Sequence, residues 1–72
     1  MPPSPKDIAR IRLENDQEEQ TLLHQSVFNI AKILTHETDA ELLLVHAILN
    51  KRLGVVEAQI VKREEYLGIK RG

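Results

Sequence analysis

The sequence of 72 residues contains no cysteine and only two aromatic residues, Phe28 and Tyr66. The absence of cysteine excludes disulfides and leaves the three histidines without the thiol partners of a structural zinc site. A chain this short buries only roughly 60–65% of the surface that its unfolded form exposes, so a lone core is marginally stable. Oligomerisation is the support that remains.

The scarcity of aromatic residues leaves Leu, Ile, Val and Ala to build the core, and these residues pack helices against helices. We therefore predict an all-α protein, either a small helical hairpin or a three- to four-helix domain, that assembles into a helical bundle. Residues 1–4 form a proline-rich flexible tail, residues 5–68 a single helical domain and residues 69–72 a basic tail.

Long apolar runs are also missing. No run approaches the about 20 residues that cross a bilayer, and the N-terminus lacks the apolar core of a signal peptide. We expect a cytoplasmic protein that does not enter a membrane.

Its net charge of −1 is unevenly spread: residues 1–50 carry four basic and eight acidic side chains, and residues 51–72 carry six basic and three acidic. An anionic partner such as nucleic acid would therefore meet the C-terminal third.

The sequence offers little catalytic chemistry. His36 and Glu37 begin the zinc-protease pattern His-Glu-x-x-His, but Ala40 occupies the position of the second histidine. His24 and Ser26, two residues apart, point to different faces of a helix and cannot act as a base and nucleophile pair. There is no glycine-rich phosphate loop. We expect no enzyme activity, no catalytic or metal-binding residue and no cofactor.

Ser4, Pro5 and Asp7 predict the start of a first helix, with a hydroxyl cap, a proline at the first helical position and an acid near the positive helix end. The polar stretch 15–20 is either a break or bend after this helix or a solvated part of one continuous helix, and we favour the break. Ile8 and Ile11 support the break, because they lie off the face of the stripe that follows. That stripe consists of Leu23, Val27, Ile30 and Leu34.

The stripe predicts a helix from residue 21 that ends near residues 35–36. Thr38 and Glu41, three residues apart and directly before an apolar run, predict a capping box at the start of the next helix. Since the link is very short, the two helices must form an antiparallel or sharply angled pair.

The leucine-rich helix 40–53 is apolar almost all round its first two turns, so it has to be covered from more than one direction. We predict a non-enzymatic protein-interaction module, a homodimer or a small subunit of a larger assembly, that binds itself or another helical protein through this helix. One stripe at helical period supplies the predicted interface: Leu42, Val45, Leu49, Leu53, Val56 and Ile60.

An alternative rests on Gly54, which lies either inside a long helix or in a turn between two helices. The spacing of Leu49, Leu53, Gly54, Val55 and Ile60 resembles the DNA-binding helix-turn-helix motif over residues 49–69. This resemblance implies a small DNA-binding regulator that uses residues 49–67. Its base- or phosphate-contacting side chains would be Gln59, Lys62 and Arg63.

Three positions depart from that motif. Asn50 stands where a small residue allows the two helices to cross, and Val56 stands where a hydroxyl side chain caps the recognition helix. Arg63 replaces a second apolar anchor. These departures favour the interaction module over the DNA-binding regulator.

Overall fold

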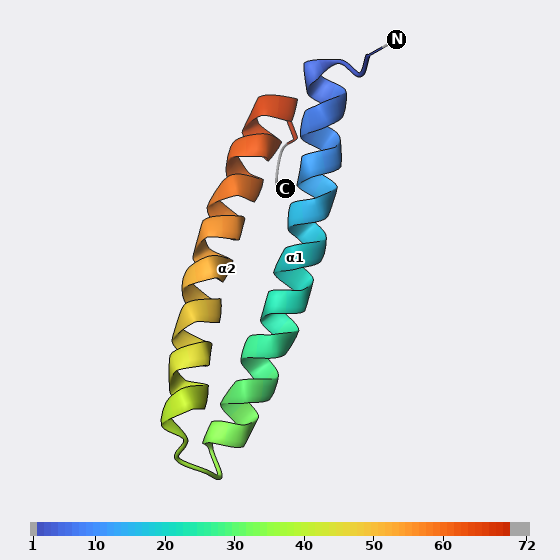
Figure 1. Ribbon diagram of the computed structural model, residues 1–72. Coiled ribbons are helices and arrows are strands. Elements are labelled where there is room, and N and C mark those ends of the chain that lie inside the picture. Colours follow the sequence, from blue (N-terminus) through green and yellow to red (C-terminus); the bar gives the residue numbers. More distant parts are fainter. Residues whose placement is uncertain (1, 70–72) are drawn as a thin grey trace.

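The computed structural model describes residues 2–69, and over this range the chain forms two helices, α1 (Pro5–Leu34) and α2 (Ala40–Leu67). They lie antiparallel and are joined by the short loop 35–39 (Figure 1). The predicted all-α hairpin is confirmed. The alternative of three to four helices is wrong, because the described residues form only these two. The predicted tail residues Met1 and 70–72 lie outside the described range.

The start of α1 is confirmed as predicted. The Ser4 hydroxyl accepts a hydrogen bond from the Asp7 backbone N–H at 3.2 Å, and the Asp7 carboxylate accepts one from the Ser4 N–H at 3.4 Å. Pro5 occupies the first helical position, where its missing N–H removes no helical bond. This capping box fixes where the chain enters the helix.

The predicted break at residues 15–20 is wrong, because α1 runs through this stretch without interruption. Three of the six polar residues there are exposed, and the other three are not. Asp16 is buried, and Glu19 and Gln20 are half-buried. Asp16 and Glu19 form ion pairs with arginines of α2. Ile8 and Ile11, which pointed to a break, belong to the same continuous helix and are exposed.

The end of α1 and both ends of α2 are capped. Helix α1 ends at Leu34, next to the predicted residues 35–36. The cap of α2 is Asp39 rather than the predicted Thr38: the Asp39 carboxylate accepts hydrogen bonds from the N–H groups of Glu41 at 2.9 Å and Leu42 at 3.1 Å. Gly68 ends α2 with a left-handed φ of 73°, a conformation that glycine adopts without steric cost.

The two helices contact each other along a seam whose residues step by three and four, the spacing of a two-helix coiled coil. On α1 the seam consists of Leu13, Asp16, Gln20, Leu23, Val27, Ile30 and Leu34. On α2 it consists of Leu42, His46, Leu49, Leu53, Val56, Ile60, Arg63 and Leu67. All of these residues are buried or half-buried.

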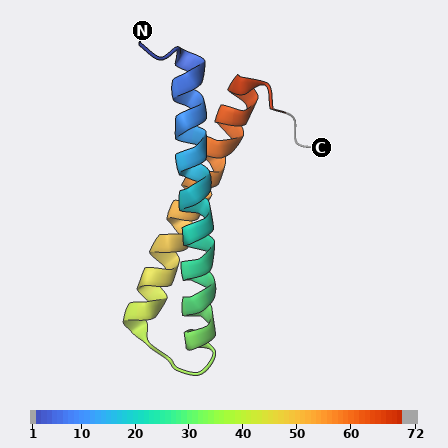
Figure 2. The ribbon, with the colours of Figure 1, turned by 90° about the vertical axis from the view of Figure 1, so that its right-hand side faces the viewer.

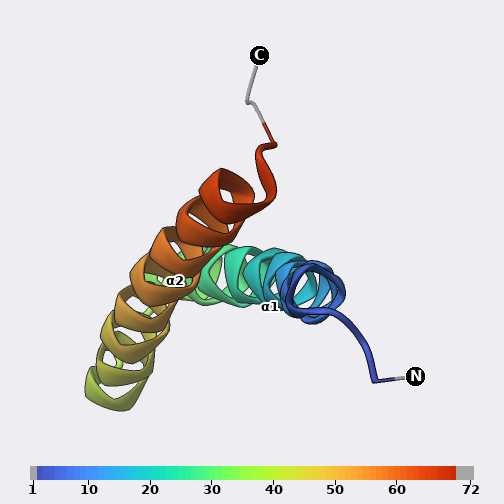
Figure 3. The same cartoon turned by 90° about the horizontal axis from the view of Figure 1, so that it is seen from above.

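Only the middle of the seam is fully closed. Figure 2 shows that the helices cross near their middles and diverge towards both ends, and the view along the hairpin in Figure 3 shows the same difference in direction. Within residues 2–69, the core accordingly consists of five residues near the crossing: Leu13, Leu23, Leu53, Val56 and Ile60. Among the residues from 25 to 51, none is buried.

Candidate interaction surface

The six predicted interface residues have different positions in the hairpin. Leu53, Val56 and Ile60 are at most 8% exposed and form the core against α1. Leu42 and Leu49 are half-buried in the seam, whereas Val45 is 41% exposed. The stripe therefore marks chiefly the face of α2 that α1 covers within the same chain. The helical period locates an apolar face, but it does not say which helix covers that face.

A second set of apolar residues on α2 remains uncovered. Leu43, Leu44, Val45 and Ile48 are 41–63% exposed and lie within two turns of the helix. Helix α1 can cover only one side of α2. Because the start of α2 is apolar all round, its other sides remain exposed. These four residues were part of the leucine-rich helix 40–53, but the single stripe singled out only Val45 among them.

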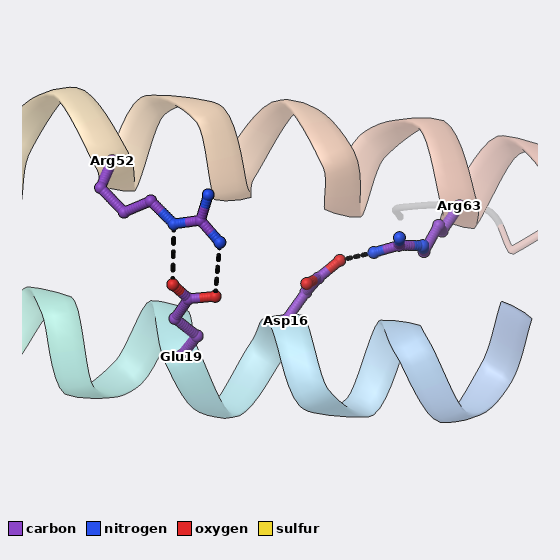
Figure 4. Close-up of polar contacts among 4 residues, drawn as sticks. All are labelled: Asp16, Glu19, Arg52 and Arg63. Carbon is purple, nitrogen blue, oxygen red and sulfur yellow. Dashed lines mark hydrogen bonds and ion pairs between the residues drawn. The ribbon is translucent and has the colours of Figure 1, made fainter.

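Polar contacts tie the two helices together around the core (Figure 4). Asp16, 8% exposed, forms an ion pair with Arg63 inside the seam. Glu19 accepts two hydrogen bonds from Arg52, at 2.8 Å from Nε and 3.1 Å from the terminal nitrogen. This two-bond geometry suits a planar guanidinium and a carboxylate. The sequence signal for these pairs is the polar stretch 15–20, although its composition favours a break.

The Glu19–Arg52 pair and a third contact lie on opposite sides of the seam. His24 Nε2 lies 3.4 Å from Glu57 Oε1. The hydrogen bond from Arg52 lowers the pKa of Glu19 below its usual value, because it stabilises the carboxylate, and the same bond raises the pKa of Arg52. Contacts on both sides of the core fix how α2 is rotated and shifted along α1.

The structure does not contain the turn that the DNA-binding alternative needs. Helix α2 is continuous through Gly54, and the Asn50 amide contacts His46 at 3.2 Å across one helical turn. Of the three predicted DNA-contacting residues, Arg63 is held by Asp16 in the seam and Gln59 is half-buried. Only Lys62 is exposed. The chain therefore presents no recognition helix of the helix-turn-helix type over residues 49–67.

Two open hollows lie at opposite ends of the hairpin. One, of about 580 Å³, lies at the loop end of α1, where the Lys32 ammonium is 5.1 Å from the centre of the Phe28 ring. The other, of about 470 Å³, lies between the start of α1 and the end of α2. It is lined by Pro5, Ile8, Ala9, Arg12, Lys62, Arg63 and Tyr66. Both hollows are open to solvent, whereas small-molecule sites bury most of the ligand surface.

Within residues 2–69, no three His, Asp or Glu side chains are grouped closely enough to hold a metal ion. Over the same range, neither helix combines the length and the apolarity that crossing a membrane requires. Comparisons with protein families, with curated proteins and with solved structures found no match. Inference about function therefore depends on the surface of the hairpin.

Proposed function

We propose that this chain is a non-enzymatic helical interaction module, a homodimer or a small subunit of a larger assembly, that binds its partner through residues 40–53 of α2. The observation that supports this proposal is the exposure of Leu43, Leu44, Val45 and Ile48 on a helix that already packs against α1. The interface predicted from the sequence thus shifts from the buried stripe to the uncovered sides of the same helix.

The energetics favour a partner for these side chains. A single exposed leucine on a protein surface is ordinary. Four large aliphatic residues are exposed within two turns of α2, and a concentration of exposed apolar surface is typical of an interaction site. Burying apolar surface contributes about 25 cal/mol per Å². A standard interface covers about 800 Å² of each partner, about one seventh of the 5714 Å² that this chain exposes.

Sedimentation equilibrium of the wild-type chain over a range of concentrations tests the proposal. We expect oligomers that dissociate when Leu44→Glu and Ile48→Glu are combined, since two carboxylates cannot be buried unpaired in an apolar contact. The matched control combines Thr21→Glu with Gln25→Glu, two exposed residues four apart on α1. The control should leave the mass unchanged, and circular dichroism should show that both variants remain helical.

The same proposal includes binding to another helical protein. A wild-type chain that stays monomeric at all concentrations, and that also fails to bind a dye for exposed apolar surface, would contradict it. An oligomer that is equally sensitive to both double variants would also count against residues 40–53 as the contact.

The DNA-binding alternative has no observation of comparable weight in its favour. It retains only the excess of basic residues in the C-terminal third and the exposed Lys62. A titration with duplex DNA at low salt tests it directly, because phosphate contacts are strongest there and weaken as salt is added.

A further inference from the structure

Four exposed residues of α2 follow one another at intervals of seven: Glu41, Ile48, Val55 and Lys62. Seven residues are close to two turns of a helix, so the four side chains form one straight row. Ile48 is 57% exposed and Val55 is 44% exposed. We name these four residues the outer row; its ends are 21 residue steps apart, or about 32 Å along the helix.

The position of the outer row relative to the seam follows from Arg52. This arginine lies four residues after Ile48 and three before Val55, so all three share one side of α2. Arg52 bonds Glu19 of α1 on that side of the hairpin. Leu22, three residues after Glu19 and 63% exposed, extends the same side onto α1. The outer row thus runs beside the seam, where a neighbouring chain can reach it without displacing α1.

The outer row has an acid at its N-terminal end, a base at its C-terminal end and two aliphatic residues between them. Glu41 and Lys62 have no ionic partner among the described residues. Such a row is complementary in charge to a second copy of itself that runs in the opposite direction. When two copies run antiparallel, Glu41 faces Lys62 and Ile48 faces Val55, each contact occurring twice about a two-fold axis. A parallel pair would place like charges together at both ends.

We propose that the occupant of this surface is a second copy of the chain, packed α2 against α2 in antiparallel orientation with the outer rows in contact. The inference rests on the proposed function, since it specifies the partner and register of the same interaction surface. Leu44 and Val45 lie next to the row and widen the apolar contact. Charge complementarity between the two ends fixes the register, and the aliphatic residues supply the apolar area.

The centre of this pairing carries a cost that makes the register testable. The two-fold axis falls between positions 51 and 52, where Arg52 is already neutralised by Glu19 of its own chain. Lys51 has no ionic partner among the described residues, so the two Lys51 side chains repel each other across the axis. Removing this charge by Lys51→Gln should therefore strengthen the dimer.

A charge exchange measured by sedimentation equilibrium tests the pairing. Glu41→Lys alone, and Lys62→Glu alone, each place like charges at both ends of the homodimer, and each should weaken dimerisation about tenfold. A mixture of the two single variants should form a heterodimer of wild-type strength, because every end then joins a lysine to a glutamate. The matched control Glu18→Lys reverses an exposed acid on α1, outside the outer row, and should change little.

Recovery in the mixture separates an interface effect from a folding defect, since two poorly folded variants would not rescue each other. The cysteine-free sequence adds an independent test. Under mild oxidation, Ile48→Cys mixed with Val55→Cys should form a disulfide between the two variants, whereas neither variant alone should be cross-linked. Cross-linking of Ile48→Cys with itself would indicate a parallel pair and overturn the proposal.

The outcomes also distinguish this inference from the proposed function. If the wild-type chain associates but neither charge reversal weakens it, or mixing does not restore it, the outer-row pairing is wrong and the interaction module survives. If the wild-type chain neither associates nor exposes dye-binding surface, the interaction module fails and the pairing fails with it.

Discussion

The half of the hairpin near the crossing and the half near the loop are both helical, yet only the first is closed. Among the described residues, 13–24 and 52–63 contain every buried side chain, both ion pairs between the helices and the contact of His24 with Glu57. Residues 25–51 contain no buried side chain, although they include the leucine-rich start of α2. An apolar sequence therefore does not by itself make a core. Closure depends on where the two helix axes come close together.

The largest expected difference between the halves comes from truncating one isoleucine in each. Ile60→Ala removes a side chain that is 1% exposed, so it leaves a cavity and should cost about 2–4 kcal/mol of unfolding free energy. Ile30→Ala acts on a half-buried seam residue near the loop and should cost less than half as much. Urea denaturation at one protein concentration measures both, and equal losses would show that the loop half is as closed as the crossing.

The buried ion pair should be more sensitive than the exposed one. Arg63→Ala leaves the Asp16 carboxylate in the seam without its partner, which should cost about 2 kcal/mol. Arg52→Ala breaks the more exposed pair with Glu19 and should have a much smaller effect. Replacing both members of the buried pair, by Asp16→Leu with Arg63→Met, should recover stability lost in Arg63→Ala. Thermal unfolding of the wild-type chain and the three variants compares them, and a double variant less stable than Arg63→Ala would contradict the explanation.

The same substitution at two glycines of α2 should have opposite effects. A Cβ at Gly54 would meet nothing within 4 Å, so Gly54→Ala should stabilise the helix by up to about 1 kcal/mol. Gly68 has a φ of 73°, which alanine adopts only with strain, so Gly68→Ala should destabilise the end of α2 by about 1 kcal/mol. Urea denaturation reports both signs. Loss of stability in Gly54→Ala would indicate a turn in place of continuous helix.

The smallest expected effect is a pH dependence of the half near the crossing. Because Arg52 lowers the pKa of Glu19 below the usual 4.5, the stability that this bond contributes is present above that value and is lost as the pH falls through the lowered pKa. Glu19→Gln should therefore reduce the loss of stability between neutral and acidic pH. Glu37→Gln, in the loop, is the control. If the wild-type chain and Glu19→Gln lost the same stability as the pH fell, the bond between Glu19 and Arg52 would not contribute to the pH dependence.

Several features of the fold could be predicted from local patterns. The Ser4–Asp7 cap, the ending of α1 near residue 35 and the stop at Gly68 depend on backbone hydrogen bonds within a few residues, and the sequence shows these residues directly. The stripe from Leu53 to Ile60 also marked a buried face. Thr38 and Asp39 are both good caps, and only the backbone conformation of the loop decided between them.

Features that depend on the second helix could not be predicted in the same way. The polar stretch 15–20 has the composition of a linker, but two of its acidic side chains form ion pairs with Arg52 and Arg63 of α2. The predicted interface stripe differs from the exposed surface for a similar reason. Helix α1 covers most of that stripe and leaves Leu44 and Ile48 of α2 exposed.

By itself, the sequence determined that this protein is helical, that α1 begins at the Ser4 cap and that α2 has more apolar surface than one neighbour can cover. These properties follow from local backbone chemistry and from the helical period. Only the tertiary structure decided which apolar residues form the core and which acids face arginines. The reason is that these contacts join residues far apart in the chain, and the crossing of the two helices selects the positions that meet.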